Sequence, residues 1–92
     1  MKETQEAYTL ALIKTKGFIE AKNVNQLAKS LGIKAENLRH TILKIKIGIK
    51  GKHNYQDYLF FDREGCVKIC YKWADEAKSV LSEKMNEILG VK

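Results

Sequence analysis

The stretch NVNQLAKSLGIKAENLRHTILKIKIG (23–48) decides the fold. Its apolar residues recur at the i, i+3, i+4, i+7 spacing of amphipathic helices, in two runs separated by Gly32. The first run predicts a helix that begins after Asn23 or Asn25 and ends at Gly32, and the second predicts a helix over 34–47 that ends before Gly48. Because glycine adopts positive φ at little cost, Gly32 is suited to a tight turn. We therefore expect two short helices joined by this turn.

One further helix is predicted before this unit. Residues 3–16 carry apolar side chains at helical spacing, with acids in the first turn and lysines in the last. Charges in this order stabilise the helix dipole. Phe18 and Ile19 follow as a short apolar step, which we expect to be one extended turn packed on the core. Asn23 or Asn25 can cap the next helix by accepting a hydrogen bond from a free backbone amide.

After this unit the apolar period changes. DYLFFD (57–62) and CVKICY (66–71) are rich in aromatic and β-branched residues and are separated by a turn that contains Gly65. They predict an antiparallel hairpin. The alternation of isoleucines around Ile47 leaves open a third, edge strand that begins there. Residues 73–89 predict a last helix with an apolar stripe, of which Trp73 would be a core anchor.

Length and composition limit the architecture. The 92 residues, 45% of them apolar, suffice for one domain with a single modest core. We expect residues 1–92 to form one mainly α domain with a small antiparallel β-hairpin. No apolar run approaches the roughly 18 residues that span a bilayer, and the N-terminus lacks a secretory signal pattern. These features predict a soluble, cytoplasmic protein with no membrane partner.

Positive charge is concentrated in one third of the chain. The net charge is +6, and the 60 residues outside 22–53 hold nine basic and ten acidic side chains. Residues 22–53 hold one acid and eight basic residues: Lys22, Lys29, Lys34, Arg39, Lys44, Lys46, Lys50 and Lys52. A focused positive field on a compact helical unit favours binding to a phosphate backbone.

Residues able to carry out catalysis or bind a metal are few. Cys66 and Cys70, four residues apart on a strand, would share a face at about 13 Å, which is too far for a disulfide. With His40 and His53 they match no common zinc spacing. No nucleophile and base stand at a catalytic spacing, and no glycine-rich phosphate loop is present. We expect free thiols, no metal, no cofactor and no enzymatic activity.

The order helix, helix, turn, helix, hairpin, helix resembles the winged helix-turn-helix family of DNA-binding domains. The resemblance covers nearly the whole chain, and its specific residues are Leu27-Ala28, Leu31-Gly32-Ile33, Leu38-Arg39, Ile42, Ile45 and Gly48. In that family the residue corresponding to Ala28 allows close helix crossing, and the helix after the turn lies in the major groove.

The resemblance implies a set of DNA contacts. On helix 34–47 the candidates for base and phosphate contact are Lys34, Asn37, Arg39, His40, Lys44 and Lys46. We expect Asn37, His40, Lys44 and Ile47 to lie farthest from the core, with Asn37 suited to adenine and Arg39 to guanine or phosphate.

The hairpin departs from the family pattern. Its turn carries the acids Asp62 and Glu64, which phosphates would repel, so Arg63 is the only plausible contact there. The loop before the hairpin offers Lys50 and Lys52 as better candidates for flanking phosphate contacts.

Core or strand packing is favoured over base stacking for the tyrosines at positions 55, 58 and 71.

The last helix suggests a homodimer. Residues 73–90 offer more apolar surface than packing on the first helix needs. The stripe that we expect to pair consists of Trp73, Ala77, Leu81, Met85 and Ile88. Paired C-terminal helices would place two reading helices about 34 Å apart, so that each meets a successive major groove.

Three functions remain open. The first is a small transcriptional regulator with helix 34–47 in the major groove. The second is an architectural or accessory protein that binds duplex DNA without sequence preference, within a larger replication or chromatin complex. The excess of Lys over Arg favours this second function. The third is a winged-helix module for protein interaction, in which Leu43 and Ile47 would contact the partner.

Overall fold

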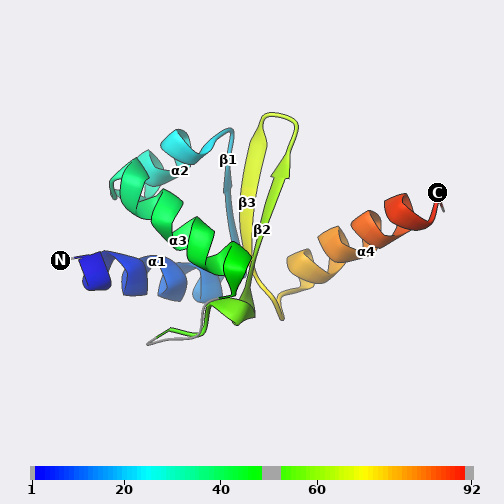
Figure 1. The fold of residues 1–92 in the computed structure, drawn as a ribbon, viewed down its shortest axis with the longest axis horizontal. Helices are drawn as coiled ribbons and strands as arrows, with labels where there is room; N and C mark the ends of the chain where they lie inside the picture. The colour runs from blue at the N-terminus through cyan, green and yellow to red at the C-terminus, as the bar shows by residue number, and fades with distance from the viewer. Residues whose placement is uncertain (1, 49–52, 91–92) are drawn as a thin grey trace.

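The computed structural model describes residues 2–48 and 53–90, and it has the winged helix-turn-helix arrangement (Figure 1). The predicted fold class, mainly helical with a small antiparallel sheet, is confirmed. In chain order the elements are α1 (Lys2–Lys16), β1 (Phe18–Ala21), α2 (Val24–Leu31), α3 (Ala35–Ile47), the 3₁₀ turn η1 (Tyr55–Asp57), β2 (Tyr58–Arg63), β3 (Cys66–Tyr71) and α4 (Asp75–Leu89).

The sheet has the strand order β1-β3-β2, with both pairs antiparallel. The hairpin of β2 and β3 is where the sequence predicts it. The third strand does not begin near Ile47, the position that the sequence left open. It forms from Phe18–Ala21, and Ile47 belongs to the last turn of α3. The physical reason is that Ile42 and Ile45 bury one side of a helix, and Gly48, at φ 70°, ends that helix in the left-handed conformation.

The turn between α2 and α3 follows the local chemistry of the sequence. The Asn23 side chain accepts a hydrogen bond from the Gln26 amide at 2.8 Å, which confirms Asn23 as the N-cap of α2. Gly32 ends α2 with a φ of 71°, and its N–H donates to the last carbonyls of the helix. Ala28 is fully buried, and its small side chain allows α2 and α3 to pack closely.

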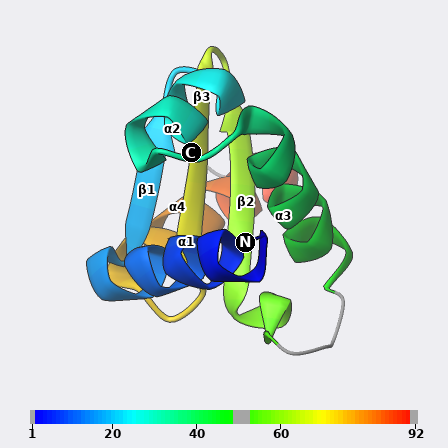
Figure 2. The same ribbon diagram turned by 90° about the vertical axis from the view of Figure 1, so that its left-hand side faces the viewer.

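The three N-terminal helices cover one face of the sheet, and α4 lies on the other (Figure 2). The core between the helices and the sheet contains Leu10, Ile13, Ile19, Leu27, Ala28, Leu38, Ile42, Ile45, Tyr55, Tyr58, Val67 and Ile69. The Tyr58 hydroxyl donates to the Leu10 carbonyl at 3.1 Å, and the Tyr58 and Tyr71 rings pack edge to face at 5.6 Å. Tyr55 and Tyr58 are buried and Tyr71 is half-buried, so packing is confirmed for the tyrosines.

The last helix begins later than the sequence predicts and packs on a different partner. α4 starts at Asp75, so Trp73 precedes it; 61% of Trp73 is exposed, and its ring lies beside the Lys72 ammonium. The prediction of Trp73 as a core anchor is therefore wrong. α4 contacts β3 and extends away from the sheet (Figure 1). Ala77 provides the fully buried contact of its first turns.

Candidate nucleic-acid interface

The inner side of α3 is occupied by the core. Leu38, Thr41, Ile42 and Ile45 are buried there, and the Thr41 hydroxyl donates to the Asn37 carbonyl one turn earlier at 3.1 Å. The exposed residues of the helix include Arg39, His40, Leu43, Lys46 and Ile47. This division leaves three surfaces of α3 to consider: a flank toward α1, an outward centre, and a flank toward β2.

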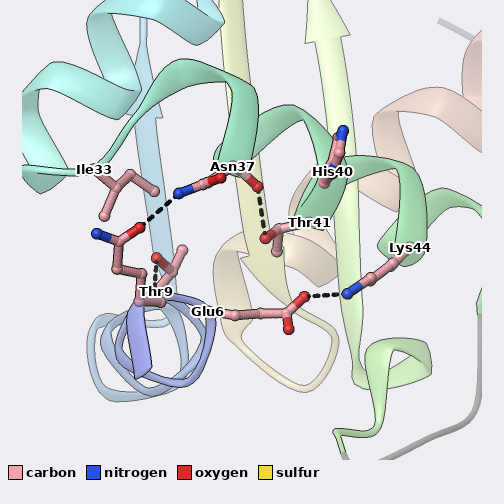
Figure 3. A pocket seen from close by; sticks show the side chains of 8 residues that line it. Glu6, Thr9, Ile33, Asn37, His40, Thr41 and Lys44 are labelled. Atoms are coloured by element: carbon pink, nitrogen blue, oxygen red, sulfur yellow. Dashed lines mark hydrogen bonds and ion pairs between the residues drawn. The ribbon is translucent and has the colours of Figure 1, made fainter. Parts of the chain in front are cut away.

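The flank toward α1 holds two of the predicted DNA contacts in bonds within the protein (Figure 3). The Asn37 amide donates to the Gln5 side chain at 2.7 Å, and the Lys44 ammonium lies 2.9 Å from the Glu6 carboxylate. The prediction that Asn37 and Lys44 lie farthest from the core is therefore wrong. Both side chains are half-buried because α1 lies beside this flank. The sequence pattern of α3 alone does not predict that α1 packs there.

A small polar cavity of about 60 Å³ lies at this junction of α1 and α3. Its walls include Thr9 and Thr41, and the His40 side chain extends away from α1 in Figure 3. Burial raises the pKa of the Glu6 carboxyl, but hydrogen bonds from the Tyr55 hydroxyl and Lys44 outweigh burial and hold the pKa below its ordinary value. Glu6 therefore stays ionised at neutral pH and keeps Lys44 beside α1.

The outward centre of α3 is less basic than the sequence predicts. The residues opposite Leu38 on the helix are Glu36, His40, Leu43 and Ile47, all exposed. Leu43 is 55% exposed and Ile47 is 63% exposed. Two apolar side chains therefore stand at the middle of the surface that the sequence assigns to base contacts.

The flank toward β2 carries two exposed cations, Arg39 and Lys46. Arg39 is exposed, and its guanidinium donates to the Asn25 side chain at the start of α2, at 2.5 Å. The Lys46 ammonium lies 4.7 Å from the centre of the Phe60 ring, a cation–π contact that directs it toward the sheet edge. Lys34 is exposed at the N-cap of α3. Arg39 and Lys46 border the outward centre on the side opposite Lys44.

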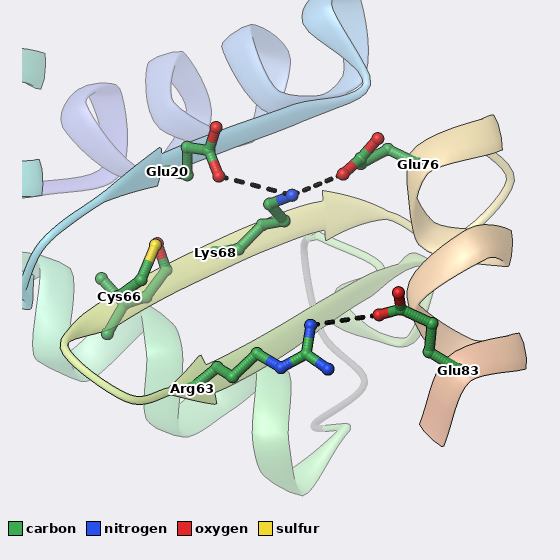
Figure 4. A network of polar contacts seen from close by, with 7 residues as sticks. Glu20, Arg63, Cys66, Lys68, Glu76 and Glu83 are labelled. Carbon is green, nitrogen blue, oxygen red and sulfur yellow. Dashed lines mark hydrogen bonds and ion pairs between the residues drawn. The ribbon is translucent and has the colours of Figure 1, made fainter. Parts of the chain in front are cut away.

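Arg63 lies apart from this surface. Its guanidinium is 3.1 Å from Glu83 of α4, on the sheet face that turns away from α3 (Figure 4). On the same face Lys68 contacts Glu20 and Glu76, and the Glu76 hydrogen bond, opposed by burial, raises the pKa of Lys68. The structure therefore does not bring Arg63 together with the α3 cations. The predicted contacts Lys50 and Lys52 fall outside the described residues.

The proposed dimer stripe is divided in the structure. Ala77 is fully buried against the chain's own sheet, so it is not available to a second copy, and Trp73 lies before the helix. The assignment of Ala77 to the dimer stripe is corrected for this reason, whereas that of Trp73, which is exposed, stays a prediction. Leu81 and Met85 are exposed. The side chain of Ile88 falls outside the described residues.

The cysteines are free thiols, as predicted. Cys66 and Cys70 lie on the same face of β3, and Cys70 is fully buried. Burial, with a smaller opposing effect of Lys68, raises the pKa of the Cys70 thiol to about 11. At neutral pH this thiol is protonated and acts as a small apolar side chain.

Gln5, Glu6 and Tyr55 are the residues of this region that sequence reasoning missed. Acids in the first turn of a helix are common because of the helix dipole, so nothing in the pattern marks Glu6 as a partner of Lys44.

None of the helices within 2–48 and 53–90 is both long enough and apolar enough to cross a membrane. Comparison with protein-family models, curated proteins and solved structures finds no match to this chain.

Proposed function

We propose that this protein binds duplex DNA inside the cell, with α3 in the major groove. The observation that carries the proposal is the charge pattern of α3: cations stand on both flanks of its exposed surface, with Arg39 and Lys46 on one side and Lys44, which is paired with Glu6, on the other. A major groove has phosphates on both rims, so the two surfaces are complementary. The net charge of +6 and the resemblance to winged helix-turn-helix domains support the same function.

Within this function we favour a small transcriptional regulator. An exposed helix with several different side chains, such as His40, Leu43 and Arg39, can distinguish base edges. An architectural or accessory protein is the alternative, because lysine supplies charge without the two-bond geometry of arginine. Selection of bound sequences from random duplex DNA at two salt concentrations separates the two, since only a regulator enriches a motif.

A protein-interaction module is the second candidate function, and the exposure of Leu43 and Ile47 favours it. Paired exposed apolar side chains on one helix commonly contact a partner protein. A partner that docks there would not explain the cations on both flanks, which is why we place DNA binding first.

The docking of α3 is tested by charge removal at matched positions. Replacing Arg39 and Lys46 together with alanine should weaken duplex binding by about 1–3 kcal/mol for each of the two side chains. The control is the double alanine variant of Lys78 and Lys84, two exposed lysines of α4 that lie across the sheet from α3. Fluorescence anisotropy with a labelled duplex measures both. An equal decrease in affinity for the control would refute docking through α3.

We further propose that two copies pair through the exposed part of α4. Leu81 and Met85 are exposed on this helix, which extends away from its own sheet. A pair joined there would present two α3 helices to one side of a duplex, about 34 Å apart. A palindromic site would then double the contact.

A further inference from the structure

We propose that Leu43 and Ile47 contact the C5-methyl groups of thymine, so that the protein prefers duplexes rich in A·T pairs. The inference rests on the proposed function, since it names the base chemistry that α3 would meet in the groove. It assigns a role to the two side chains that make the centre of this surface apolar.

Leu43 and Ile47 form one small apolar surface. They are one helical turn apart, so their side chains lie on the same side of α3, about 6 Å apart along its axis. At 55% and 63% exposure, neither contributes much to the core. Since base pairs are stacked about 3.4 Å apart, a separation of about 6 Å allows contacts one to two steps apart.

The charges on both flanks of this apolar surface favour one class of partner over another. Arg39 and Lys46 lie on one flank, and Lys44, which is paired with Glu6, lies on the other, so basic side chains border the apolar centre on both sides. The floor of a major groove lies between two lines of phosphates, and the thymine methyl is the apolar group that its base edges present. Glu36, the acid on the outward side, lies about 10 Å before Leu43 along the axis.

An apolar surface of a partner protein fits this arrangement less well. It could cover Leu43 and Ile47, but it would leave the flanking cations without a complementary charge unless it carried acids on both sides. The excess positive charge of residues 22–53 is matched by a polyanion without that further requirement. DNA is therefore the occupant that the charge distribution favours.

The experiment removes the methyl groups and leaves the base pairing unchanged. Two duplexes of one A·T-rich sequence are compared, one with thymine and one with deoxyuridine at every thymine position. Wild-type protein should bind the deoxyuridine duplex about fourfold more weakly for each methyl in contact, since a buried methylene contributes about 0.8 kcal/mol. The Leu43→Ala, Ile47→Ala double variant should bind the two duplexes equally.

A matched control is the exposed aromatic residue Tyr8 of α1. Tyr8→Ala also removes an exposed apolar side chain, but from another helix, so it should keep the full preference for thymine. Circular dichroism checks the fold of each variant. The difference between the affinities of the wild-type protein for the two duplexes can be measured without any variant.

Each result bears on the inference. Equal affinity of the wild type for both duplexes would overturn it and leave DNA binding intact. A thymine preference that survives in the double alanine variant would assign the preference to duplex shape and would also overturn the inference. Failure to bind either duplex at low salt would overturn the inference together with the proposed function.

Discussion

Glu6→Gln is the substitution that tests the α1–α3 junction most sharply. The Glu6 carboxylate accepts a hydrogen bond from Lys44 at 2.9 Å, and only 14% of the Glu6 side chain is exposed. A hydrogen bond to a charged group contributes about 1.5–3 kcal/mol. Because 40% of the Lys44 side chain is exposed, solvent screens the pair, and we expect a destabilisation of about 1 kcal/mol at pH 7.

The effect should depend on pH in a defined direction. The pKa of Glu6 in the folded protein is below its ordinary value of 4.5, because the bonds from Tyr55 and Lys44 outweigh burial. The stability that its ionisation contributes is therefore present above the ordinary pKa and is lost as the pH falls through the lowered folded-state pKa. The difference between wild type and Glu6→Gln should be present at pH 7 and should shrink toward zero well below pH 4.5.

Thermal unfolding followed by circular dichroism measures this difference. For a domain of this size, a destabilisation of about 1 kcal/mol lowers Tm by about 4–8 °C. Glu64→Gln, at the exposed turn of the hairpin, is the control and should change stability by less than about 0.5 kcal/mol. An unchanged Tm at pH 7, or an equal decrease at pH 7 and pH 3, would refute the reasoning.

The Glu6→Gln variant should also bind duplex DNA slightly more tightly than the wild type does, because Lys44 is released from Glu6 toward the phosphates.

Two further predictions concern the dimer and the loop before the hairpin. Leu81→Glu with Met85→Glu should convert a dimer to a monomer in sedimentation velocity at micromolar concentration, whereas Ser82→Glu, also exposed on α4, should leave the mass unchanged; a monomeric wild type would rule out this interface. Replacing Lys50 and Lys52 together with alanine should weaken binding to all duplexes by a similar factor, as measured by anisotropy, because phosphate contacts do not distinguish sequences; a decrease confined to one sequence would contradict this.

The helices and the hairpin could be predicted because their signals are local. Gly32 and Gly48 adopt the positive φ with which α2 and α3 end. The spacing of Leu38, Ile42 and Ile45 identifies the buried side of α3 without further information. The strand β1 could not be predicted because four residues are too few for a period to appear, and its partner β3 lies far away in the sequence.

The candidate interface was predictable only in part. The cations of α3 can be read from the sequence, but their availability depends on contacts between distant elements. Asn37 and Lys44 are held by Gln5 and Glu6, and Arg63 is held by Glu83. These pairs join residues 20 to 38 positions apart, and no spacing rule relates them. The sequence therefore identifies the charged region but not the partners within the protein that Asn37, Lys44 and Arg63 contact.

We propose that this protein binds duplex DNA by contacting the phosphates and the major groove of the duplex. The most direct measurement is the affinity of the wild-type protein for a duplex of about 20 base pairs over a series of salt concentrations. If α3 and the flanking lysines contact phosphates, the logarithm of the association constant should fall linearly with the logarithm of salt concentration, with a slope of about −0.9 for each phosphate contact. Binding that is absent at low salt, or that does not change with salt, would contradict the claim.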